Sequence, residues 1–182
     1  MDKEKQKKTI KKIRNICIIL VVLLFVIKLN KALFFLVIFS ILTYLGKYIR
    51  GMFGLKLVVL DPLLFAAIMM AKHIGFKEAI ILVAINTLIV DFATSIASDG
   101  TFANFFLFSA GAIISVMLFG GMNVVVYASI GGLIYASGYF VYRTFVPTQP
   151  KFEVLSKCFT SFLFTFLYAS FFGPLLGLIM SV

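Results

Sequence analysis

The sequence predicts an all-α fold: a polytopic membrane helix bundle with six core transmembrane helices and a marginal N-terminal hydrophobic helix before them. Hydrophobic residues make up 62% of the 182-residue chain, and the mean hydropathy is +1.11. Soluble domains are roughly 45–50% apolar by comparison. The apolar residues also form consecutive segments separated by short polar or glycine-rich joints, which is typical of a chain that crosses a bilayer repeatedly. We therefore expect a multi-pass protein of the cell membrane.

The N-terminal region combines a basic tail with the shortest apolar segment. Residues 1–14 contain six lysines and one arginine. We expect this tail in the cytoplasm, against anionic headgroups, and we expect no nucleic-acid partner because no folded basic domain accompanies it. Residues 15–29 have an apolar core of only residues 16–27, with basic residues at both ends. This helix either spans the bilayer with its charges at the two surfaces or lies in the interface.

The six core segments follow within one bundle, residues 32–180. A spanning helix needs about 20 mostly apolar residues, with roughly 17 as the usual minimum. In chain order the segments are 32–48, 57–72, 76–98, 102–119, 122–143 and 154–180.

The second core segment is interrupted near its start. Asp61 and Pro62 are typical of an N-cap followed by proline in the first helical turn. A helix that begins at Pro62 and ends at Lys72 is short for a complete span. Residues 54–60 are therefore either irregular backbone that lines a cavity or part of an ordinary helix with a proline kink.

The third core segment has a polar face. Asp91 lies on it, about two turns before the end of the segment, since each residue rises 1.5 Å. Such groups usually face the bundle interior, so the face is a candidate binding surface. Alternatively, Asp91 caps a neighbouring helix or reaches water at the interface. The positions that share this helical face are Thr87, Asp91, Thr94, Ser95 and Ser98.

The later segments add further polar and aromatic groups. Asn104 opens the fourth core segment. In the fifth, Tyr135, Tyr139 and Tyr142 share a helical face, and Arg143 follows them. These tyrosines form either an aromatic belt at the headgroup level or a wall on which a ligand stacks beside a cation. Small residues suited to close helix packing recur in the same segment at Ala128, Gly132 and Ala136.

Following the chain back and forth sorts the polar joints onto two sides of the membrane, X and Y. Side X is cytoplasmic if residues 15–29 cross the bilayer, and side Y is cytoplasmic if they do not. Side X holds Lys47, Arg50, Lys56, Asp61, Asp99, Arg143, Lys151, Glu153 and Lys157. Side Y holds Lys28, Lys31, Lys72, His73, Lys77, Glu78, Gly120, Gly121 and the C-terminus.

The candidate ligand-binding residues all belong to the X half. The basic residues among them favour an anionic or zwitterionic small molecule, with hydrogen bonds from the aspartate and asparagine and stacking on the tyrosines. The set is Lys47, Arg50, Asp91, Thr94, Ser98, Asn104, Tyr139, Tyr142 and Arg143.

We expect no catalytic residues, no metal and no cofactor. His73 is the single histidine, and the two cysteines, Cys17 and Cys158, are far apart. There is no nucleotide-binding motif, so any energy coupling must come from another protein. A membrane enzyme would depend on the carboxylates of Asp61, Asp91 and Asp99.

The order of several short motifs resembles two families across roughly residues 32–180. One comprises the S components, the substrate-binding subunits of energy-coupling-factor vitamin transporters; the other is the MreD rod-shape-determining family. The motifs are residues 41–49 (ILTYLGKYI), 54–57 (GLKL), 61–64 (DPLL), 75–76 (GF), 88–92 (LIVDF) and 100–102 (GTF).

Each resemblance implies a different partner. An S component works with a transmembrane T component and ATP-binding-cassette ATPases, whereas an MreD-like protein is a membrane scaffold that contacts cell-wall synthesis proteins. Residues 32–48 lack the Ala-xxx-Ala docking surface expected of an S component, although Ala67 and Ala71 have that spacing in the next segment.

Overall fold

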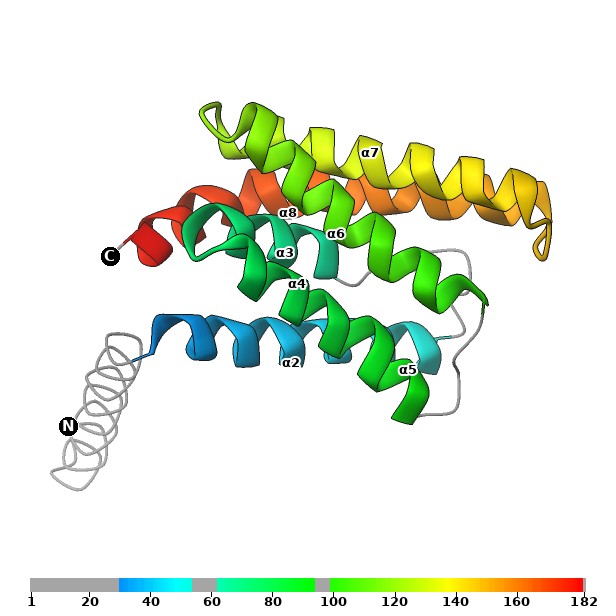
Figure 1. Ribbon diagram of the computed structural model, residues 1–182, viewed down its shortest axis with the longest axis horizontal. Coiled ribbons are helices and arrows are strands. Elements are labelled where there is room, and N and C mark those ends of the chain that lie inside the picture. The colour runs from blue at the N-terminus through cyan, green and yellow to red at the C-terminus, as the bar shows by residue number, and fades with distance from the viewer. Residues whose placement is uncertain (1–29, 54–61, 94–98, 182) are drawn as a thin grey trace, which may run out of the picture. The chain divides into compact units, whose positions relative to one another are not determined.

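A computed structural model describes residues 30–53, 62–93 and 99–181 of the chain. All regular secondary structure in these ranges is helical, which confirms the predicted all-α class. The chain divides into two compact units, Met1–Phe34 and Phe35–Val182. The basic tail and the predicted helix 15–29 lie outside the described residues. In chain order the helices are α2 (Lys31–Met52), α3 (Leu63–His73), α4 (Phe76–Ala84), the π-helix η1 (Ile85–Ile89), α5 (Val90–Ala93), α6 (Asp99–Phe119), α7 (Val124–Phe145) and α8 (Lys151–Ser181) (Figure 1).

Four helices are long and apolar enough to cross a membrane, which indicates a membrane protein. By length and composition they are Lys31–Ile49, Gly100–Phe119, Val124–Phe145 and Lys151–Ser181. The predicted segments 57–72 and 76–98 correspond to shorter described helices, since residues 54–61 and 94–98 are not described. Six core spans therefore stay a prediction.

Helix α3 forms the centre of the second unit. It contacts α4, α6, α7 and α8, and every residue from Leu63 to Ala71 is buried. Its nine buried residues are apolar on all sides of the helix, and a helix that is apolar all round packs in the interior rather than along one face. The helix begins at Leu63, one residue after the predicted start, with no side-chain cap at Pro62. The predicted cap Asp61 lies outside the described residues.

Helix α7 packs against both α6 and α8 (Figure 1). The backbones of α6 and α7 approach closely at two glycines, where a Cβ placed on Gly111 would lie 2.9 Å from the carbonyl oxygen of Gly131. On the α8 side of α7, a Cβ on Gly132 would lie 3.5 Å from the Cα of Phe162. Small residues allow helix backbones to approach closely in this way, and Gly132 belongs to the predicted small-residue stripe.

The helical run of residues 76–93 contains the π-helix η1 in its second half. Two side chains inside the run bond back to the preceding turn: Asn86 Nδ2 donates to Leu82 O at 2.9 Å and Thr87 Oγ1 donates to Val83 O at 2.7 Å. Such bonds compete with the backbone ladder for the same carbonyl oxygens. A π-turn adds a residue to one turn of the helix. Thr87 and Asp91 therefore do not share one face in the way that the regular 3.6-residue repeat predicted.

Candidate functional site

Arg143 is a buried cation in the last turn of α7. The residue is 7% exposed to solvent. The Nε atom donates to the hydroxyl of Tyr139 at 3.1 Å, and a terminal nitrogen donates to the Thr148 hydroxyl. The guanidinium carbon lies 5.3 Å from the Tyr139 ring centre and 5.1 Å from that of Tyr142. The guanidinium is thus held by both hydrogen bonds and cation–π contacts.

The hydrogen bonds continue from α7 into α8. The Tyr139 hydroxyl donates to Gln149 Oε1 at 3.2 Å, and Lys157 Nζ donates to the same oxygen at 3.2 Å. Lys157 also forms an ion pair with Glu153 at 2.8 Å. These bonds join the end of α7, the following turn and the start of α8 on side X. We call the set the α7–α8 network; its members are Tyr139, Tyr142, Arg143, Thr148, Gln149, Glu153 and Lys157.

An aromatic column extends the network along α7 toward α6. The rings of Phe108 and Tyr135 are stacked with centroids 4.3 Å apart, and those of Tyr135 and Tyr139 are 5.9 Å apart. The Tyr135 hydroxyl donates to Asn104 Oδ1 at 3.2 Å. Tyr135 and Tyr139 are buried, so their rings pack against neighbouring helices. Whether this face stacks on a ligand or forms part of an aromatic belt stays a prediction.

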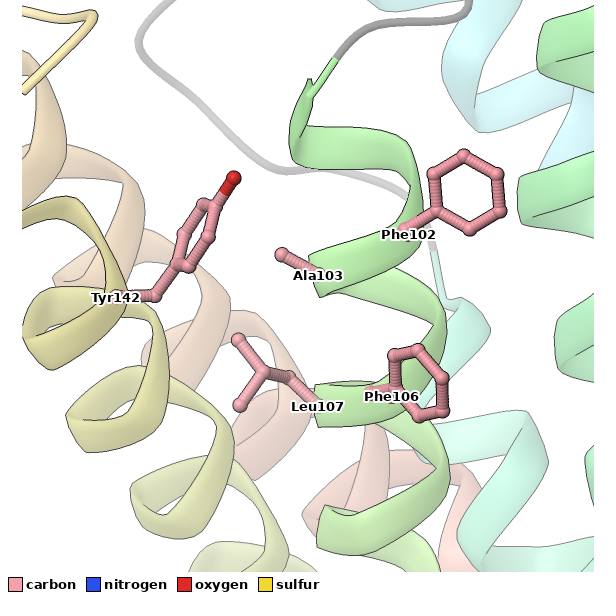
Figure 2. A pocket seen from close by; sticks show the side chains of 5 residues that line it. All are labelled: Phe102, Ala103, Phe106, Leu107 and Tyr142. Carbon is pink, nitrogen blue, oxygen red and sulfur yellow. The ribbon is translucent and has the colours of Figure 1, made fainter. Parts of the chain in front are cut away.

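A groove lies between the X ends of α6 and α7. Its volume is about 450 Å³, and its walls are mainly apolar. Ala103 and Leu107 point from α6 toward Tyr142 on α7, while the rings of Phe102 and Phe106 stand on the other side of α6 (Figure 2). Tyr142 is the member of the α7–α8 network that reaches this groove.

A second polar group connects α2 with the run 76–93 and with α6. Lys47 Nζ lies 3.5 Å from Asp91 Oδ1 and donates to the backbone oxygen of Asn86. The other carboxylate oxygen of Asp91 accepts from Thr101 Oγ1 at 2.9 Å. Asn86 Nδ2 donates to Ser40 Oγ at 3.0 Å. We call these five residues the α2 cluster: Ser40, Lys47, Asn86, Asp91 and Thr101. They belong to three parts of the chain, namely α2, the helical run 76–93 and α6.

The predicted site residues thus divide between two sets of bonds. Tyr139, Tyr142 and Arg143 belong to the α7–α8 network, and Asn104 joins it through the Tyr135 column. Lys47 and Asp91 belong to the α2 cluster. Arg50 lies in α2, but its side chain is not described. Thr94 and Ser98, which were also predicted, lie outside the described residues.

Sequence reasoning missed several polar partners. Thr148 and Gln149 stand in the joint just after Arg143, and their polarity in so short a joint is the signal that could have identified them. Ser40 was missed although it stands seven residues before the predicted Lys47, a spacing that places both on one helical face. The pairing of Asn86 with Ser40 had no signal in the sequence, because it depends on how α2 lies against the run 76–93.

Neither metal ligation nor a surface thiol is found in the described part of the chain. There, no three His, Cys, Asp or Glu side chains lie close enough together to hold a metal ion. Cys158 is 8% exposed, and its sulfur donates to Ala136 O at 3.2 Å. Topology labelling on side X therefore requires an introduced cysteine in place of the native one.

Comparison with known proteins identifies no relative from which a function could be transferred. No protein-family model, no curated protein and no solved structure matches this chain. The interpretation of the site therefore depends on its own geometry, together with the resemblance of short motifs described above.

Proposed function

We propose that this chain is a membrane substrate-binding subunit of a transporter for a small anionic or zwitterionic molecule, similar in role to the S components. The observation that carries the proposal is the buried guanidinium of Arg143 between the rings of Tyr139 and Tyr142. Charged side chains inside membrane bundles are costly and usually mark a ligand or ion path. A guanidinium presents a planar fork that suits a carboxylate or phosphate, while the tyrosines offer ring faces for stacking.

The surroundings of Arg143 support an anionic ligand group. Lys157 supplies a second cation whose side chain is 18% exposed, and it shares the Gln149 oxygen with Tyr139. One guanidinium nitrogen donates to Thr148, an exposed residue of the turn between α7 and α8. A hydroxyl in an exposed turn can give way to a ligand oxygen. The ligand then replaces one hydrogen bond and leaves the others in place.

The proposal has a definite membrane arrangement. It comprises six core transmembrane helices, side X outside the cell, helix 15–29 in the interface and a cytoplasmic N-terminus. Because the sequence contains no nucleotide-binding motif, energy would come from a membrane partner subunit and its ATP-binding-cassette ATPases. Within this arrangement Arg143 and its tyrosines bind the ligand, and the ion pair of Lys47 with Asp91 holds α2 against the helical run 76–93.

Gentle detergent purification from the native membrane, followed by mass spectrometry, tests this function. We expect a bound small molecule, a T-type membrane subunit and ATPases in the parent sample. Arg143→Gln should lose the small molecule while keeping the partners, because the guanidinium binds the ligand and does not dock the subunit. Lys77→Gln, at an exposed position on side Y, is the matched control and should retain both. A parent sample without ligand and without ATPases contradicts the proposal.

Orientation provides an independent test. In a background carrying Cys17→Ser and Cys158→Ser, Lys151→Cys reports side X and Met122→Cys reports the opposite end of the bundle. Both positions are exposed. We expect an impermeant maleimide to label Lys151→Cys on intact cells and Met122→Cys only after lysis. The reverse pattern would place side X in the cytoplasm and reject capture from outside.

A second function, an MreD-like scaffold, is favoured by one observation. The polar side chains of the α7–α8 network bond to one another, as in the contact of Tyr139 with Gln149 and the ion pair of Lys157 with Glu153. Such mutual pairing suits a rigid helix pair that presents a fixed surface to a partner. In the same purification, cell-wall synthesis proteins without any bound small molecule would favour this function. Arg143→Gln would then alter cell shape and leave uptake unchanged.

A further inference from the structure

The π-helix η1 makes one backbone carbonyl of the run 76–93 accessible to a cation. After this turn, the N–H of Val90 donates to the carbonyl oxygens of Ile85 and Thr87, the residues before and after Asn86. The Asn86 carbonyl oxygen accepts from Lys47 Nζ of α2. Single turns of π-helix are frequent at functional sites. Here the irregular turn places a carbonyl oxygen against a positive charge.

Thr43 adds a buried hydroxyl that has no hydrogen-bond partner in the described part of the chain. The residue is 0% exposed, and its Oγ1 atom is buried. Thr43 stands between Ser40 and Lys47 on one face of α2, and both of these neighbours bond to Asn86. The Thr43 hydroxyl therefore faces the same part of the run 76–93. A buried polar atom without a partner is costly, so this hydroxyl points to an occupant such as an ion.

The charges of the α2 cluster fit one monovalent cation. Asp91 is its single carboxylate, and the single positive charge is Lys47 Nζ, which lies 3.5 Å from Asp91 Oδ1. A charge-assisted hydrogen bond measures about 2.7–2.9 Å, so the ammonium is not bonded directly to this oxygen. The Lys47 side chain is 25% exposed, and its long stem allows the ammonium to move toward side X. Asp91 then needs another positive charge, because a carboxylate left unpaired inside a membrane bundle is costly.

We propose that the α2 cluster binds one monovalent metal cation, Na⁺, in exchange for the Lys47 ammonium. Its ligands are the Asp91 carboxylate, the Asn86 backbone carbonyl, the Thr43 hydroxyl and the Thr101 hydroxyl, which already bonds to Asp91 Oδ2 at 2.9 Å. Backbone carbonyls at interruptions of membrane helices coordinate Na⁺ in this way. The ammonium leaves with its proton as the cation enters, so the net charge of the site is unchanged. A divalent cation would leave an uncompensated positive charge.

A proton on Asp91 is the other means of replacing the positive charge of the ammonium. A proton would neutralise the carboxylate and leave the Thr43 hydroxyl without a partner, whereas a metal cation binds carboxylate, carbonyl and hydroxyl oxygens together. The unpartnered hydroxyl therefore favours the metal cation. The site does not rest on the proposed transport function, because none of its ligand residues belongs to the α7–α8 network.

Equilibrium binding of radioactive Na⁺ to the purified full chain in detergent tests the proposal, with choline chloride holding the ionic strength constant. We expect saturable binding of one Na⁺ per chain. Mg²⁺ should not displace it, because the site supplies a single carboxylate. Asp91→Asn should abolish the binding. Binding that does not saturate, or that persists unchanged in folded Asp91→Asn, would overturn the proposal.

Thr43→Val is the most specific variant, because it replaces the hydroxyl by a methyl group of similar size. The lost hydroxyl has no partner in the described residues, so the variant should fold as the parent does. Its affinity for Na⁺ should fall about tenfold or more, the usual effect of weakening a metal site. Thr165→Val, at a 4% exposed position of α8, is the matched control and should bind Na⁺ normally. Equal affinity of Thr43→Val and the parent would refute the site.

Lys47→Met removes the competing ammonium. It should bind Na⁺ about tenfold more tightly than the parent, in which the ammonium must leave first. Its melting temperature should rise with Na⁺ and not with choline. If acid stabilised Lys47→Met and Na⁺ did not, the occupant would be a proton and the cation site would be rejected. Arg143→Gln should bind Na⁺ as the parent does, so the cation result and the small-molecule result can fail separately.

Discussion

Helices α7 and α2 are held in the second unit by different kinds of contact. Helix α7 packs closely against α6 through Gly111 and Gly131 and against α8 through Gly132. Residues 35–52 of α2 bury Phe35, Phe39 and Thr43, and their remaining described attachments are hydrogen bonds and an ion pair made by Ser40 and Lys47. Close approach of backbones distinguishes α7, whereas α2 is held by a short buried stripe and a few polar bonds.

The difference teaches how much freedom each helix has. Close backbone packing in a membrane resists any increase in side-chain volume and keeps two helices in one register. A few polar bonds can be broken one at a time, and in a membrane each averages only about 0.6 kcal/mol. We therefore expect α7 to be the rigid part of the site and α2 the part that can move.

The largest effect should come from filling the α6–α7 contact. Gly111→Ala would place a Cβ 2.9 Å from the Gly131 carbonyl oxygen, so the backbones must separate. We expect a loss of about 1–3 kcal/mol in the free energy of unfolding. Mixed-micelle denaturation followed by circular dichroism measures it.

The control for this change is Gly177→Ala in α8. There the new Cβ would lie 3.7 Å from His73, an ordinary contact. Since alanine favours helix over glycine by up to about 1 kcal/mol, this control should be neutral or stabilising. If both variants had the same stability, the close approach of α6 and α7 at Gly111 would not limit side-chain volume.

An intermediate effect should come from breaking the attachment of α2. Lys47→Met removes the ion pair with Asp91 and the bond to the Asn86 carbonyl. Such bonds average about 0.6 kcal/mol each in a membrane, so the loss of both should make the helix open roughly eightfold more often. The reporter is maleimide labelling of Thr43→Cys, a position that is 0% exposed, without the native cysteines. Lys77→Met, at the opposite side, should leave the labelling rate unchanged.

The smallest effect should come from the ion pair within α8. Glu153→Gln removes the partner of Lys157 at a spacing of four residues, while Lys157 keeps its bond to Gln149. Ion pairs at this spacing contribute about 0.3–0.5 kcal/mol to the free energy of unfolding, and salt screens them. Denaturation at low and high salt should show a small loss that disappears at high salt. A loss as large as that of Gly111→Ala would contradict the small contribution expected of an ion pair within one helix.

The helical repeat of the sequence predicted some of the site residues but not the contacts that other residues make. The spacing of three and four residues predicted that Tyr135, Tyr139 and Tyr142 share one helical face beside Arg143. The π-helix was not predicted, since it depends on which carbonyl oxygens Asn86 and Thr87 take from the backbone. The glycine contact of α6 with α7 was also missed, because Gly111 and Gly131 stand 20 residues apart in different segments.

By itself the sequence determined the helical class and the apolar segments, and it predicted which polar groups lie at the same end of the bundle. These properties follow from local composition and from the 3.6-residue repeat of a helix. Only the tertiary structure decided that Lys47 pairs with Asp91, that Tyr135 stacks on Phe108, and that a groove separates the X ends of α6 and α7. Such contacts join residues of different helices, and their partners are set by the rotation of each helix about its axis.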